Sequence, residues 1–194
     1  MARPSLIGST RSYLIEILRR NLGVWGIGCI LGAAFLLRAW PLLMGMPVEH
    51  PDEYTYAFIP LNFFSGDINP HFFTYPTLHY YLLAMVYALH YLASDFSFYE
   101  WVSYHYLWQP EDLLQLARWV SVAFSVATVL VVGAIVRHFA GVQAGLVAAS
   151  VLACNVIHVR QSSLAAVDIP LAFWVASVVW GALRLLHSGE RKDY

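Results

Sequence analysis

Long apolar stretches constrain this chain most, because a run of about 20 apolar residues can form a helix that crosses the hydrocarbon core of a bilayer. Residues 22–44 form such a run and contain one charged residue, Arg38. Residues 114–136, 141–158 and 168–186 are three further candidates. Only 12% of the chain is charged and 59% is hydrophobic, whereas about a quarter of an average soluble domain is charged. The sequence therefore predicts an all-α integral membrane protein with four transmembrane helices.

The charged residues are distributed unevenly along the chain. The N-terminal arm, residues 1–21, carries four arginines, whereas residues 45–113 contain eight acidic residues and no lysine or arginine. Because Lys and Arg are enriched in cytoplasmic loops, we expect the arm inside and residues 45–113 outside. Four spans also return the basic tail, residues 187–194, to the cytoplasm. The prediction is a multi-pass protein of the cell (inner) membrane with a cytoplasmic N-terminus.

The first outer loop, residues 45–113, is long enough to contain structure of its own. Residues 76–93 are apolar, but a span here would place the basic tail outside. We therefore interpret them as a juxtamembrane helix that lies at, or re-enters, the outer interface, which suits their tyrosines and histidines. A second juxtamembrane helix is expected from about 52 to 64. Since loops longer than about 15 residues are usually functional, we expect the polar chemistry of the protein here.

The segment His50-Pro51-Asp52-Glu53 follows the first apolar run directly. It suits a helix start, because proline is favoured at the first helical position and acidic residues at the positive end of a helix. It also suits a functional site, because ionisable groups close to a membrane are costly and are usually functional. A carboxylate there could accept a proton from a hydroxyl group. Asp52 and Glu53 together could instead hold a divalent cation.

A second set of charged residues is expected on the same side of the membrane. Asp168 opens the last apolar run, where it could cap the helix or face the same leaflet as Asp52. Arg118 and Arg160 also lie towards this side, and an arginine fork binds phosphate well. Arg118 could equally extend to the interface by snorkelling, as could Arg38, and Arg160 could be a surface charge. The sequence alone leaves these alternatives open.

Several motifs occur in an order that is known from one family. The chain contains, in order, HPDEYTYAFIPLNFFSGDINPHFFTYPTLHYYL (50–82), ARWVSVAFSVATVLVVGAIVRHFAG (117–141) and SLAAVDIPLAFW (163–174). The Asp-Glu pair after the first span is the most specific element, and the Tyr75-Pro76 step and the aspartate of the last span reinforce it. The sequence resembles the N-terminal part of GT-C glycosyltransferases, and most closely their protein O-mannosyltransferase-like, phospholipid-carrier-dependent branch.

The resemblance implies a GT-C fold and an inverting transfer of a sugar from a polyprenyl-phosphate carrier to a protein, lipid or glycan acceptor outside the cytoplasm. Asp52 would be the general base, with Glu53 and Asp168 as supporting acidic groups. The implied contacts to the substrate or to the lipid phosphate are made by four residues: His50, Tyr75, Arg118 and Arg160. The juxtamembrane helices of the first loop would cradle the carrier.

Family members are much longer than these 194 residues. The resemblance therefore implies a truncated or partial enzyme, and the missing C-terminal part of the enzyme is an expected partner. The alternative is a non-catalytic membrane subunit, or a relic, that binds a lipid phosphate or partner helices. Besides the membrane itself, the expected partners are the lipid-linked donor and the acceptor, and no nucleic acid is expected.

Overall fold

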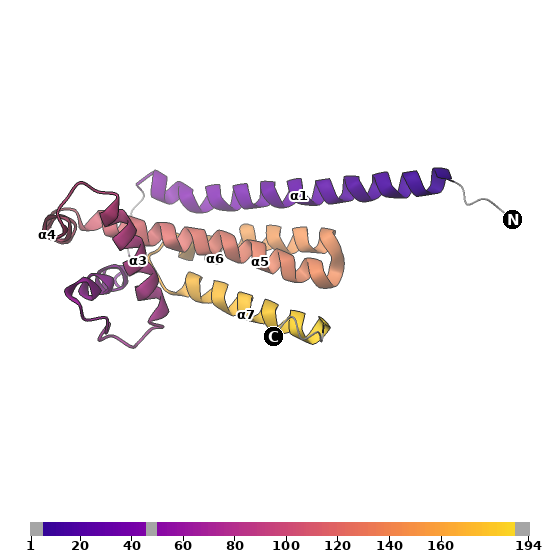
Figure 1. Ribbon diagram of the computed structural model, residues 1–194. Coiled ribbons are helices and arrows are strands. Elements are labelled where there is room, and N and C mark those ends of the chain that lie inside the picture. Colours follow the sequence, from indigo (N-terminus) through magenta and orange to yellow (C-terminus); the bar gives the residue numbers. More distant parts are fainter. Residues whose placement is uncertain (1–5, 46–49, 189–194) are drawn as a thin grey trace.

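The computed structural model describes residues 6–45 and 50–188. The regular structure of this part of the chain is entirely helical, and it contains no strand, which confirms the all-α prediction for the described residues. Long helices lie side by side and form a bundle, and shorter helices gather at one end of it (Figure 1). The long helices contain the apolar stretches of the sequence, and most of the short helices are formed by the acidic first loop, residues 45–113.

The first apolar run belongs to helix α1, Leu6–Leu43. This helix also includes most of the N-terminal arm, so the arm and the predicted span at 22–44 form one continuous helix. Within α1, Gly23–Leu43 is long and apolar enough to cross a membrane. Pro41 lies in the last turn, close to the point where the helix ends.

The next two predicted spans, 114–136 and 141–158, belong to the single element α5, Pro110–Ala153. Gly141 interrupts it with φ 84° and ψ 176°, and the chain reverses there to form a helical hairpin (Figure 1). The positive φ explains the glycine at this position. The second arm ends at Ala153, short of the predicted end at 158, and a separate helix α6, Val156–Ser162, follows it.

The two arms of α5 pack very closely through glycines. A Cβ atom at Gly145 would lie 2.7 Å from the carbonyl oxygen of Gly133 and 2.7 Å from the Cβ of Arg137. A Cβ at Gly133 would lie 3.1 Å from the Cβ of Ala149. Small residues at such positions let two helix backbones approach, as they do in membrane bundles.

The last long helix is α7, Asp168–Ser188. Three helices of the described chain are long and apolar enough to cross a membrane, and they contain the segments Gly23–Leu43, Pro110–Ala153 and Asp168–His187. The hairpin α5 counts as one of the three.

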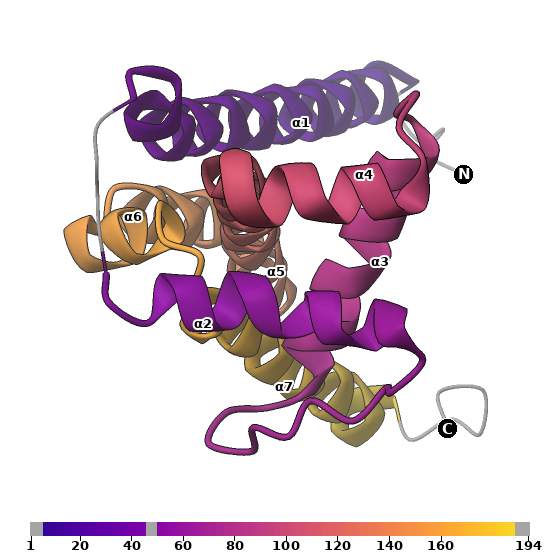
Figure 2. The ribbon, with the colours of Figure 1, turned by 90° about the vertical axis from the view of Figure 1, so that its left-hand side faces the viewer.

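Short helices form a layer that runs across one end of the bundle (Figures 1 and 2). We call residues 53–108 the transverse layer. Its elements are α2 (Glu53–Phe58), η1 (a 3₁₀ helix, Ile59–Ser65), α3 (Leu78–Leu92), α4 (Phe98–Ser103) and η2 (a π-helical turn, Tyr104–Trp108). The helices at 53–65 and 78–92 occupy the segments where juxtamembrane helices were predicted, whereas α4 and η2 were missed.

Buried aromatic side chains hold the transverse layer to the bundle. Trp101 and Tyr87 are fully buried and pack with Leu83, Leu113 and other apolar residues. The hydroxyl of Tyr87 donates to the carbonyl of Ala57 at 3.0 Å and lies 3.2 Å from the carbonyl of Leu113. These contacts join α3 to α2 and to α5, so the first loop is a packed unit.

The glycine contact in the hairpin gives a direct test of the fold. We expect Gly145→Ala to lower the unfolding temperature in detergent, because its Cβ would push the two arms apart. The matched control is Gly28→Ala, where a Cβ would meet no described heavy atom within 4 Å. Both changes gain about 1 kcal/mol of helix propensity, so the difference between them isolates the packing. Equal unfolding temperatures would contradict the close approach of the arms.

Candidate functional site

The two adjacent carboxylates of the sequence motif lie in different environments. Glu53 is the first residue of α2, and its side chain is 1% exposed. Asp52 lies at the N-cap position, its side chain is 52% exposed, and it makes no capping hydrogen bond in the described structure. Pro51 lies before the helix and does not occupy its first position as expected. The motif therefore places one acid in the protein interior and the other at its surface.

Glu53 forms a buried ion pair with Arg118 of α5. The Nε atom of Arg118 donates to Oε1 of Glu53 at 2.9 Å, and Nη2 donates to Oε2 at 3.0 Å. The backbone N–H of Ala165 donates to Oε1 at 2.6 Å, and that of His50 donates to Oε2 at 3.1 Å. Two-point pairing of this kind is strong and fixes the relative geometry of the groups. The pair thus joins α2, α5 and the connection between α6 and α7.

This geometry changes the expectations for both partners. The structure does not support the snorkelling alternative for Arg118, because its side chain is 14% exposed and its fork binds Glu53. A lipid phosphate would have to displace that carboxylate. The donor set does not fit a divalent cation held by Asp52 and Glu53, because four N–H groups already occupy the oxygens of Glu53. Among the described residues, no group of three His, Cys, Asp or Glu side chains could hold a metal ion.

Asp52 has histidine and tyrosine neighbours. Nδ1 of His50 accepts from the backbone N–H of Asp52 at 3.3 Å and lies 3.9 Å from its carboxylate. Tyr56 is buried nearby, and its ring meets that of half-buried Tyr75 edge-on at 5.0 Å. Burial, the hydrogen bond with Tyr75 and the charge of Asp52, in that order, raise the pKa of Tyr56. The structure therefore places His50 beside Asp52, and it links Tyr75 to Asp52 through Tyr56.

An apolar cleft of about 120 Å³ lies between the start of α3 and the start of α7. Its lining residues include Pro76, His79 and Trp174. The side chain of His79 is buried, and neither ring nitrogen has a partner within the described structure. Burial lowers the pKa of His79 to about 4, so the ring is neutral at pH 7. Asp168, the exposed first residue of α7, lies beside this cleft because its neighbours Val167 and Pro170 line it.

The remaining predicted cation, Arg160, lies on the short helix α6. It is exposed and forms no ion pair with another described residue. Its position is that of a surface charge, one of the two alternatives that the sequence left open. Its binding to a lipid phosphate stays a prediction.

Arg38 is a buried polar centre that sequence reasoning missed. It is fully buried, so it does not extend to the interface by the snorkelling that the sequence allowed. Its guanidinium donates to the hydroxyl of Ser125 and lies 3.0 Å from Nδ1 of His158. It also donates, at 2.9 to 3.3 Å, to three backbone carbonyls: those of Ala34, Leu152 and Ala153. Because the last carbonyls of a helix carry partial negative charge, the end of α5 stabilises this cation without a carboxylate.

No model of a known family, no curated protein and no solved structure matches the chain. The class of the protein therefore comes from its own structure. In its described part it is an all-helical protein, with three helices long and apolar enough to cross a membrane, and the buried Glu53–Arg118 ion pair joins the transverse layer to α5.

The buried ring of His79 predicts a specific dependence of stability on pH. Its pKa is about 4 in the folded protein and ordinarily near 6.5, so the unfolded chain binds the proton more readily between these values. The free energy of unfolding should fall by up to about 3 kcal/mol as pH drops from 6.5 to 4. We expect His79→Leu to remove this loss in denaturant titrations at pH 7, 6, 5 and 4.

The control for this experiment is His138→Gln, which changes an exposed histidine in the other half of the chain. It should keep the wild-type dependence on pH. If His79→Leu loses as much stability as the wild type between pH 6.5 and 4, the buried and uncharged state of His79 is wrong.

Proposed function

We propose that this chain is the N-terminal part of a membrane glycosyltransferase that moves a sugar from a polyprenyl-phosphate carrier to an acceptor on the extracytoplasmic side. Asp52 acts as the general base. The observation that carries the proposal is the contrast within the Asp-Glu pair: Glu53 is fixed by Arg118, whereas the carboxylate of Asp52 is exposed and makes no capping bond. The sequence resemblance to GT-C enzymes supplies the reaction.

The chemistry requires one group that accepts a proton. In an inverting transfer, the acceptor hydroxyl attacks C1 of the sugar from the face opposite the phosphate, and its proton passes to Asp52. The bond between C1 and the phosphate oxygen breaks, and polyprenyl phosphate leaves with the electron pair. A positioned carboxylate contributes about 10²- to 10⁴-fold to such a step. Glu53 supports it by fixing the backbone next to Asp52.

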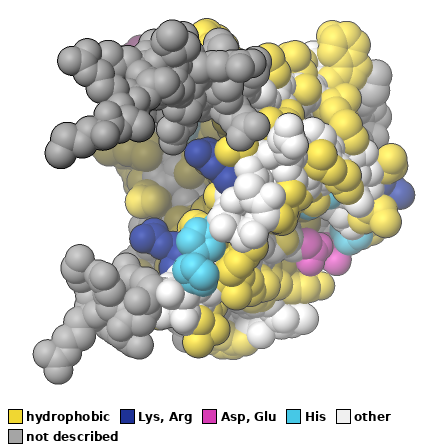
Figure 3. Space-filling model, turned by 90° about the vertical axis from the view of Figure 1, so that its right-hand side faces the viewer, with side chains coloured by type: hydrophobic (Ala, Val, Ile, Leu, Met, Phe, Trp, Pro, Cys, Tyr) yellow, Lys and Arg dark blue, Asp and Glu magenta, His cyan; other side chains and the backbone are white. Residues whose placement is uncertain are grey.

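The distribution of charge supports a four-span arrangement with the transverse layer outside. The spans would be α1, the two arms of α5, and α7. Arg137 follows Arg118 by nineteen residues in the first arm of α5, or about 28 Å at the helical rise, which is close to the thickness of the hydrocarbon core. Arginine and histidine side chains are visible at the end opposite the transverse layer (Figure 3). Basic residues at that end favour a cytoplasmic location for it.

The apolar cleft beside Asp168 supports the choice of donor. Its position between α3 and α7 would admit part of a prenyl chain from the outer leaflet. Asp168 would then lie near the reacting end of the carrier as a supporting acid. Exposed Arg160 is the candidate for contact with the lipid phosphate, because Arg118 is engaged with Glu53. His50 and Tyr75 would contact the sugar or the acceptor near Asp52.

The alternative function is a non-catalytic membrane subunit that binds a lipid phosphate or partner helices. One observation favours it: only 11% of the apolar stretch of α7 is buried inside the described structure. Partner helices would cover this face. The two proposals differ in whether Asp52 takes part in chemistry.

The catalytic proposal is tested with membranes that contain the chain, with and without a co-expressed C-terminal part, and with polyprenyl-phosphate mannose as donor. We expect Asp52→Asn to lower the rate of mannose transfer at least about 100-fold. The control is Asp67→Asn, which changes another exposed carboxylate of the same loop, one that pairs with His71.

The control should keep wild-type transfer. Unchanged transfer by a folded Asp52→Asn protein would contradict the assignment of the base. If the wild type transfers no mannose in either preparation but co-purifies with the C-terminal part, the subunit alternative holds.

A further inference from the structure

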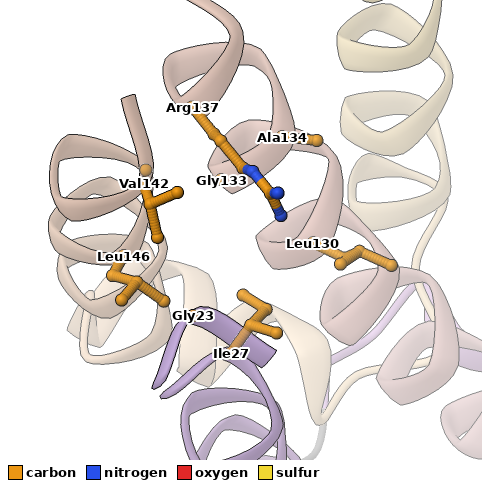
Figure 4. A pocket seen from close by; sticks show the side chains of 9 residues that line it. Gly23, Ile27, Leu130, Gly133, Ala134, Arg137, Val142 and Leu146 are labelled. Carbon is orange, nitrogen blue, oxygen red and sulfur yellow. The ribbon is translucent and has the colours of Figure 1, made fainter. Parts of the chain in front are cut away.

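A second cleft lies far from Asp52, between α1 and the helical hairpin of α5 (Figure 4). It has a volume of about 100 Å³. Its walls are apolar, and the side chains that define them are those of Ile27, Leu130, Ala134 and Leu146. One charged residue, Arg137, contributes to the lining. The cleft thus combines an apolar wall with a single cation.

The cleft exists because three of its lining residues are glycines. Gly133 and Gly145 bring the two arms of α5 together, and a side chain on either would strike the other arm. Gly23 of α1 faces Val142, whose Cγ1 would lie 2.9 Å from a Cβ at that position. The three helical segments therefore approach closely, and the absence of glycine side chains leaves space between the larger apolar groups.

Arg137 extends over this space. Figure 4 shows its guanidinium directed between the arm of α5 that carries it and Ile27 of α1. Arg137 is exposed and forms no ion pair with another described residue. Residues 113–167 contain no Asp or Glu. The acidic residues of α5, Glu111 and Asp112, lie in its first turn, at the far end of the arm that carries Arg137. The complementary ligand has an anionic group for the arginine and a hydrocarbon part for the walls.

The position of Arg137 along α5 identifies the source of such a ligand. It lies about 28 Å from the level of Arg118, and the hydrocarbon core of a bilayer is about 30 Å thick. If the Glu53–Arg118 pair lies at one face of the core, Arg137 lies at the head-group level of the other. Phosphodiester groups occupy this level, and basic pockets between membrane helices bind anionic head groups there.

We propose that this cleft binds one anionic phospholipid of the leaflet opposite the transverse layer. Its phosphodiester pairs with Arg137, since an arginine fork matches phosphate oxygens. A segment of one acyl chain lies along the walls formed by Ile27, Leu130 and Leu146. The site requires no glycosyl transfer, but its level in the membrane rests on the proposed four-span arrangement.

The test is native mass spectrometry of the full chain in detergent, titrated with phosphatidylglycerol or with phosphatidylcholine of the same acyl chains. We expect the wild type to bind phosphatidylglycerol at least about 10-fold more tightly, which exceeds the roughly fivefold gain from one basic residue near an anionic surface. Arg137→Gln should remove this preference, and Arg137→Lys should retain part of it. Ala134→Phe, which fills the cleft, should weaken binding of phosphatidylglycerol about 10-fold.

The matched control is Arg184→Gln, which removes one positive charge from an exposed site on α7. It should keep the preference of the wild type. The proposal is overturned if Arg137→Gln retains the preference, or if Arg184→Gln loses it equally, because both results indicate general attraction to a basic surface. Displacement of the lipid by an equal concentration of inorganic phosphate would show a simple anion site instead. Thermal unfolding of each variant confirms that it is folded.

Discussion

The buried ion pair between Glu53 and Arg118 determines how the transverse layer sits on the bundle. Breaking a buried pair costs several kcal/mol, because the remaining charge is left unpaired. The pair also receives the backbone N–H of Ala165, so the entrance to α7 depends on the same carboxylate. The oxygens of Glu53 are occupied by hydrogen bonds, whereas the carboxylate of Asp52 is exposed to solvent. A structural acid thus fixes the position of its chemically available neighbour.

Different interactions hold the two ends of the bundle. Near the transverse layer, Arg38 joins α1 to the end of α5 through carbonyl oxygens, and the Glu53–Arg118 pair joins the layer to α5. At the other end, close glycine packing between Gly133 and Gly145 holds the hairpin together. The polar end carries the proposed reaction, and the glycine-lined end carries the proposed lipid site. At the glycine-lined end the cation of Arg137 and an apolar wall lie together, which is the pattern that an amphiphilic ligand requires.

The sequence predicted the helical class because long apolar runs allow few alternatives, and the acidic loop indicated that residues 45–113 form a separate unit. The missed helix α4 had a local signal, since Ser97 and Glu100 form a capping box. The burial of Arg38 had no local signal in the sequence. An arginine near the end of an apolar run looks the same whether it extends to the interface or donates to buried backbone carbonyls, as Arg38 does. The different environments of Asp52 and Glu53 depend on Arg118, which is distant in sequence, so local pattern could not separate the two acids.

The central claim is that Glu53 holds the transverse layer to the bundle through its ion pair with Arg118, whereas the side chain of Asp52 makes no contribution to that attachment. Hydrogen–deuterium exchange of the full chain in detergent tests this most directly, by comparing wild type, Glu53→Gln and Asp52→Asn. The account predicts that Glu53→Gln raises the exchange rates of amides in α2 and of Ala165 at least about 10-fold, since one broken contact worth 1.4 kcal/mol changes an opening equilibrium by that factor. It also predicts wild-type exchange in Asp52→Asn. Equal exchange in the two variants would contradict this claim.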